Sequence, residues 1–199
     1  MDNMTKRHLI HAALLVSFAF GIAPAAASDD VQYWDEKNGF SLRHSASLKP
    51  LPPGESEEDV ENEVLLLRDP TFEGADAGDS TPVKIDVMIG QPTDFPRPAM
   101  IDYLDMQTPV KPKISSVKVS GIRATELVYR NGAPEGATDV LIITEINAKG
   151  KAIVIRGRYT VRGCARQASS AQCKKEVAEE DEAKMGEIER LVKSFKLKK

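Results

Sequence analysis

The sequence predicts an α+β fold, in which helices pack on a sheet of antiparallel strands. Two apolar, β-branched runs, 139–146 and 151–159, flank Asn147-Ala-Lys-Gly150, which suits a type I turn with a positive φ at its glycine. Both runs contain consecutive apolar residues, so we expect both faces of this hairpin to be covered at the centre of the sheet. The segment 174–195 has the apolar spacing of a long amphipathic helix that packs on one face.

The first 27 residues have the pattern of a secretory signal peptide. A short basic region (6–8) precedes an apolar core (9–22), and the alanines 25–27 are the small residues that a signal peptidase reads. The apolar core is shorter than the ~20 residues of a membrane span. We therefore expect cleavage before Ser28, a periplasmic or secreted protein without a membrane span, and one domain over residues 28–199.

The charge of the chain excludes some classes of partner. The signal segment contains Asp2, Lys6 and Arg7, so its removal changes the formal net charge from −3 to −4. Nucleic acids and anionic membranes select basic surfaces, and we therefore expect neither as a partner.

The two cysteines, Cys164 and Cys173, are an even pair in a chain that we expect to be exported. Such pairs usually form a disulfide, and closing this short loop would stabilise the fold by about 2.6 kcal/mol. A metal or redox site would need a second Cys/His pair or a C-x-x-C spacing, and neither occurs.

Turn signals and alternation divide the rest of the chain into strands. Asn38-Gly39 predicts an opening hairpin, beside which Trp34 is expected to pack with one side wet. Apolar side chains occupy every second position of residues 83–89, on the face opposite to Lys84, Asp86 and Met88. This alternation predicts a half-buried strand. The strands expected before the central hairpin are 31–34, 40–43, 64–68, 82–89, 113–119 and 122–129.

A short helix is predicted over residues 99–106, after the proline-rich segment 90–98. We expect it to lie on the sheet with its Met and Tyr stripe in the core. A pocket between this helix and the sheet is the alternative, and its lining would be Met88, Met100, Tyr103 and Leu104.

Residue patterns typical of catalysis are missing from the sequence. Beyond the signal segment His44 is the one histidine, which argues against Ser-His-Asp and multi-histidine metal sites and favours a surface or packing role. No nucleotide-binding, hydrolase or zinc-protease motif occurs. We expect no catalysis, cofactor or metal site, and Asp86 and Asp102 are the acids that an enzyme would use.

Two clusters of charge were weighed as ligand sites. In the loop 69–82, the acids Asp69, Glu73, Asp76 and Asp79 offer oxygens to calcium, but their spacing does not match the calcium-loop pattern, and we expect a solvated loop. The second cluster is a small anion patch at the end of the second hairpin strand. It would contain Arg156 and Arg158, with Arg162, Arg123 or Arg130 nearby, unless these arginines pair with neighbouring carboxylates.

The order of the elements resembles the PsbP-like group, small exported bacterial proteins related to the extrinsic protein PsbP of photosystem II. The residues that carry the resemblance are the opening hairpin with Tyr33-Trp34 and residues 38–42, the segment 117–124, and the long hairpin before a helix that ends at residues 192–197. The resemblance implies an α/β/α sandwich, a mainly antiparallel sheet with helices on both faces. At residues 44–48 the chain departs from the aromatic-Pro-x-x-Trp stretch of the family, and no metal-binding residue carries over.

The resemblance further implies a non-enzymatic accessory role, in which the protein assists or stabilises a protein assembly of the cell envelope. A periplasmic small-molecule carrier is the alternative, using the pocket between the sheet and the short helix. Fold likeness alone does not license either function. The sequence leaves the partner, the ligand and the oligomeric state open.

Overall fold

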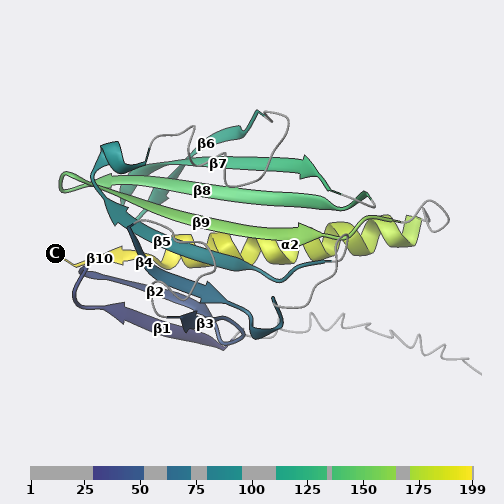
Figure 1. The fold of residues 1–199 in the computed structure, drawn as a ribbon, viewed down its shortest axis with the longest axis horizontal. Helices are drawn as coiled ribbons and strands as arrows, with labels where there is room; N and C mark the ends of the chain where they lie inside the picture. Colours follow the sequence, from purple (N-terminus) through teal and green to yellow (C-terminus); the bar gives the residue numbers. More distant parts are fainter. Residues whose placement is uncertain are drawn as a thin grey trace, which may run out of the picture.

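The structure, a computed structural model, describes residues 29–51, 62–72, 80–95, 111–133, 136–164 and 171–198. These ranges contain two antiparallel sheets and one long helix (Figure 1). The elements are β1 (Asp30–Asp35), β2 (Phe40–Ser45), β3 (Lys49–Leu51), β4 (Glu63–Arg68), the 3-10 helices η1 (Pro70–Phe72) and η2 (Pro92–Asp94), β5 (Lys84–Gly90), β6 (Lys113–Val119), β7 (Ile122–Gly132), β8 (Thr138–Ala148), β9 (Lys151–Val161), α2 (Ala171–Ser194) and β10 (Lys196–Leu197).

The large sheet has seven strands in the order β3-β4-β5-β9-β8-β7-β6. The predicted central hairpin is β8 and β9, which pair along their full length from Thr138↔Val161 to Ala148↔Lys151. β5 and β7 flank this hairpin, so its long apolar runs lie in the middle of the sheet, as the sequence predicts.

The small sheet has three strands in the order β1-β2-β10. β1 and β2 are the opening hairpin around Asn38-Gly39, and the Asp35 carboxylate accepts the backbone N–H of Asn38 at 2.8 Å to close the turn. β10, at the end of the chain, pairs with β2 at Ser41 and Phe40. In Figure 1 β1 lies along the outer rim of the molecule, and β10 lies close to the C-terminus.

The main core lies between the large sheet, helix α2 and the inner face of β2. Ile188, Leu191 and Val192 of α2 are buried against this sheet, and Phe195 stacks on Phe40 with ring centroids 5.3 Å apart. At Gly157 the helix comes so close that an added Cβ would lie 2.6 Å from Ile188 Cδ1. A strand glycine therefore sets the approach of helix to sheet.

The second face of the large sheet has its own smaller apolar cluster. Its members are Met88, Leu127, Tyr129, Leu141, Ile143 and Val154, with Phe95 packed against them. A buried ion pair between Asp86 and Arg156 lies on the same face. β5 is therefore buried on both faces over Lys84–Met88, and the predicted half-buried strand is wrong.

The predicted α/β/α sandwich with helices on both faces is also wrong. In the described ranges one long helix covers one face of the large sheet, and two antiparallel sheets make up most of the fold. Consecutive apolar residues in β8 and β9 indicate burial on both faces, and the described side chains of the second face are an apolar cluster and the Asp86–Arg156 ion pair. The predicted signal peptide and the short helix 99–106 lie outside the described residues.

The turn between β8 and β9 also differs from the prediction. Asn147 and Ala148 continue β8, and the loop is the pair Lys149-Gly150, with φ of 53° and 76°. Two consecutive positive φ angles define a type I′ turn, whose twist matches that of the strands it joins. Ser120-Gly121 makes the same turn between β6 and β7, with φ of 53° and 79°.

Candidate functional site

The outer face of the small sheet carries the most exposed aromatic side chain in the described residues. Tyr33 of β1 points into the core, so its neighbour Trp34 points out and is 69% exposed. Val31 of the same strand is 45% exposed, but it lies on the face opposite to Trp34, because side chains alternate along a strand. An exposed aromatic side chain as large as Trp34 is typical of an interaction site.

Trp34 begins a row of residues that crosses all three strands of the small sheet. Ser41 of β2 lies opposite Trp34, and Lys196 of β10 lies opposite Ser41. A hollow of about 340 Å³ opens beside this row, with Phe40 and Leu197 among its apolar walls. Its charged lining has both signs: Asp35, Glu36, Lys196 and Lys198. Because an aromatic anchor, an apolar hollow and charges of both signs meet here, this surface suits a protein segment better than a small ion. We call it the Trp34 surface.

The sequence indicates the Trp34 surface only in part. The sequence predicts that Trp34 packs beside the opening hairpin with one side wet, whereas its ring is 69% exposed, because alternation in β1 turns Tyr33 inward and Trp34 outward. The pairing of Ser41 with Lys196 joins residues far apart in the chain, through a strand of two residues. No local pattern identifies so short a strand, and the hollow beside it was missed for that reason.

Asp86 and Arg156 form a buried pair on the second face of the large sheet. Nε and Nη2 of Arg156 each lie 2.7 Å from Asp86 Oδ2. The two side chains are 0% and 3% exposed. The predicted anion patch therefore has an internal counter-ion at Arg156, while Arg158 lies two residues further along β9 and is only partly buried.

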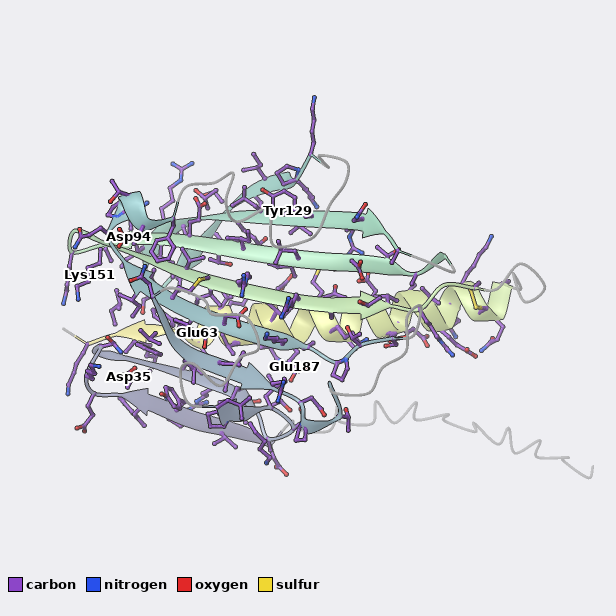
Figure 2. The ribbon with its side chains drawn as sticks, in the orientation of Figure 1. Asp35, Glu63, Asp94, Tyr129, Lys151 and Glu187 are labelled. Carbon is purple, nitrogen blue, oxygen red and sulfur yellow. A yellow bond between two sulfur atoms is a disulfide. The ribbon has the colours of Figure 1, made fainter. Side chains whose placement is uncertain are left out.

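Glu63 of β4, which Figure 2 labels, interacts with both residues of this pair. Burial raises the pKa of Glu63 to about 7, and the charge of Asp86 and a hydrogen bond with its carboxyl add to the rise, against the opposing charges of Lys84 and Arg156. Paired carboxyls with a raised pKa are a known arrangement for acid–base chemistry. Here, however, Asp86 is fully buried and bound to Arg156, so we assign the group to the stability of the sheet.

The predicted small-molecule pocket is only partly described. Met88 is buried in the second-face cluster, next to Val154 across the strand pair. Met100, Tyr103 and Leu104 lie outside the described residues, as does Asp102. The pocket therefore stays a prediction.

A polar network joins α2 to the end of β9. Lys184 Nζ donates to the carbonyl oxygens of Thr81 and Thr160 at 2.6 and 2.9 Å, and to Glu180 Oε1 at 2.8 Å. Burial opposes ionisation of Glu180, but hydrogen bonds from Lys184 and Ser80 hold its pKa below the usual range. Lys184 has the hydrogen-bond partners of a charged ammonium, so its contact with the Ser80 hydroxyl ties the helix to the sheet and does not activate a nucleophile.

The disulfide between Cys164 and Cys173 is present, and it joins the end of the sheet to the first turns of α2. Nearby arginines contact helix carboxylates: Arg130 Nη2 lies 2.9 Å from Asp181, and Arg162 Nη2 lies 3.1 Å from Glu176. Burial, together with a hydrogen bond to Asp181, raises the pKa of Tyr159. Arg130 and Arg162 thus pair with carboxylates of α2, and the anion patch of Arg156 and Arg158 stays a prediction.

Metal ligands do not gather within the described ranges, where no three His, Cys, Asp or Glu side chains come together. Asp69 of the predicted acidic loop accepts hydrogen bonds from the backbone and hydroxyl of Thr71 at 2.9 and 2.7 Å. The other three acids of that loop lie outside the described residues. His44 is buried, and its Nδ1 lies 2.8 Å from the Ser45 carbonyl oxygen.

Membrane contact was also considered. In the part of the chain that the structure describes, no helix combines the length and apolarity that crossing a membrane requires.

Comparisons with known proteins find similar folds at low sequence identity. No protein-family model matches the chain, and no curated protein matches it. The Ran-binding protein Mog1p of Saccharomyces cerevisiae has a TM-score of 0.49 and 10% identity, over 86% of this chain and 96% of its own. A PsbP of the cyanobacterium Synechocystis has a TM-score of 0.46 and 12% identity, over 92% and 98%. A protein of Bacteroides thetaiotaomicron has a TM-score of 0.42 and 14% identity, over 84% and 48%.

No sequence family confirms the resemblance to PsbP that the sequence indicates. All three TM-scores lie below 0.5. The function proposed below accordingly rests on residues of this chain.

Proposed function

We propose that the protein is an exported, non-catalytic binding protein that contacts a protein partner of the cell envelope through the Trp34 surface. The single observation that carries the proposal is Trp34, 69% exposed beside an apolar hollow in an otherwise well-packed fold. Tryptophan contributes more than most residues to interface affinity, because it combines a large apolar area with an N–H donor and few rotatable bonds.

Two features support export. The first 27 residues have the basic, apolar and small-residue regions of a signal peptide in the usual order. The Cys164–Cys173 disulfide also supports export, because disulfides form and persist in oxidising compartments. The acidic net charge fits a protein partner better than nucleic acid or an anionic membrane.

A non-catalytic role agrees with the chemistry of the described residues. Within them the carboxyl of Glu63, whose pKa is raised to about 7, lies beside Asp86 and its partner Arg156 inside the large sheet. The hollow of the Trp34 surface is lined by a hydroxyl, two lysines and the carboxylates of Asp35 and Glu36, and among the described residues no histidine or cysteine borders it. Its residues are suited to recognition.

The experiment is site-specific photocrosslinking in the native host. A benzophenone amino acid is placed at position 34, and in a matched control at position 114, because Ile114 of β6 is also a large apolar side chain, 63% exposed, on a different edge. We expect one discrete crosslinked envelope protein from position 34 and none from position 114. Equal products from both positions, or none from position 34, would refute the proposal.

A further inference from the structure

The outer edges of the two sheets differ in how well they are protected. β3 and β10 are only three and two residues long, and β3 contains Pro50. β6 has seven residues and carries Lys113 and Lys118. Short length, proline and lysine all prevent an edge strand from pairing with another chain. β1 has six residues and neither proline nor lysine, so it is the least protected edge in the described ranges.

The backbone of β1 points its hydrogen-bonding groups toward that edge. The N–H of Arg43 donates to Ser194 Oγ at 2.7 Å, and its carbonyl oxygen accepts from the same hydroxyl at 3.2 Å, so both groups face away from β1. In an antiparallel pair, opposite residues exchange both hydrogen bonds or neither. Gln32, opposite Arg43, therefore points its backbone N–H and C=O away from β2. The backbone N–H and C=O of Trp34, two residues further along, point to the same side.

Charge argues against a second copy of this chain at the edge. Residues 29–36 contain four acids and no basic residue. If two β1 strands paired antiparallel about Gln32, Asp29 of each copy would lie opposite Asp35 of the other. Like charges directly opposite one another destabilise a strand pair, whereas lysine or arginine at these positions would stabilise it.

We propose that the free edge of β1 binds an extended segment of the partner protein, which adds as a fourth strand to the small sheet. The segment has apolar residues at alternate positions, to contact Val31 or Trp34, and basic residues at both ends, to face the acids that flank β1. This inference deepens the proposed function, because it assigns a strand-adding partner to the same surface.

The test is a titration of the isotope-labelled protein, purified from the periplasm, with synthetic peptides. The probe is a nine-residue peptide of alternating valine and threonine between Lys-Arg ends. A second peptide has Asp-Glu ends, and a third is the probe with N-methylated amides at alternate residues, which keeps the side chains but removes the strand hydrogen bonds. With the probe we expect the amide chemical shifts of Gln32 and Trp34 to change. The peptide with Asp-Glu ends should bind about tenfold more weakly, and the methylated peptide should not bind.

Two variants and one further measurement make the outcomes distinct. Trp34→Ala should weaken binding of the probe about tenfold, and Ile114→Ala should not change it. Equal binding of the methylated peptide would overturn strand addition while leaving the Trp34 surface intact. Strand addition at β1 would also be overturned if no peptide bound, or if the chemical shifts changed on β6. A dimer of the free protein that Gln32→Pro abolishes would overturn it as well. Photocrosslinking at position 34 judges the proposed function independently.

Discussion

The two sheets of this protein use their faces differently. The large sheet is buried on both faces: α2 covers one, and the other carries the second-face cluster and the Asp86–Arg156 pair. The small sheet is buried on one face only, where Phe40 and Leu42 join the main core, and its outer face presents Trp34. Substitutions in the large sheet should therefore change stability, and substitutions on the outer face of the small sheet should change binding.

The largest effect is expected where a buried charge loses its partner. Asp86→Ala removes the buried carboxylate that Nε and Nη2 of Arg156 both contact, and we expect a loss of about 3–5 kcal/mol in the free energy of unfolding. Urea denaturation measures it. Adding Arg156→Met should recover most of the loss, because the buried guanidinium charge is then removed as well. A single variant as stable as the wild type would show that the pair does not stabilise the large sheet.

The next effect tests the helix-covered face. Gly157→Ala places a methyl group 2.6 Å from Ile188 Cδ1, and the forced shift of α2 should cost about 1–3 kcal/mol. Gly132→Ala on β7 is the matched control, because no atom lies within 4 Å of its added Cβ. Thermal unfolding compares the two variants. Equal melting temperatures would contradict the close approach of helix and sheet.

These two positions also show what sequence can predict. An isolated glycine in an apolar strand indicates a close backbone approach, and consecutive apolar residues in β8 and β9 placed them correctly at the centre. The Asp86–Arg156 pair was not predictable, because alternation in β5 assigns Asp86 to a solvent face until β9 brings its arginine alongside. The Trp34 surface likewise depends on β10, which returns from the end of the chain to pair with β2.

A smaller effect depends on pH. The folded protein raises the pKa of Glu63 from 4.5 to about 7, so between these values the folded state holds more of this proton than the unfolded state. Glu63 therefore contributes stability below about pH 4.5 that is lost as the pH rises toward 7. Urea denaturation measures the free energy of unfolding at pH 5 and at pH 8. Between these two values it should decrease more for the wild type than for Glu63→Gln. Identical pH dependence in the two proteins would contradict the raised pKa.

The smallest change in stability is expected on the outer face of the small sheet. Trp34→Ala removes an exposed ring, so the free energy of unfolding should change by no more than about 0.5 kcal/mol. Urea denaturation checks it, and the same preparation should have lost its affinity for the partner. If Trp34→Ala lowered the free energy of unfolding by several kcal/mol, Trp34 would behave as a core residue. The outer face of the small sheet would then not differ from the buried faces of the large sheet.

Amide hydrogen exchange of the protein, alone and bound to its crosslinked partner, tests the central claim most directly. In the free protein the amides of Gln32 and Trp34 point to the open edge of β1, and they should exchange quickly. In the complex we expect these amides to become protected, while exchange on β6 stays unchanged. Fast exchange at Gln32 and Trp34 in the complex, with new protection elsewhere, would contradict the assignment of β1 as the partner-binding edge.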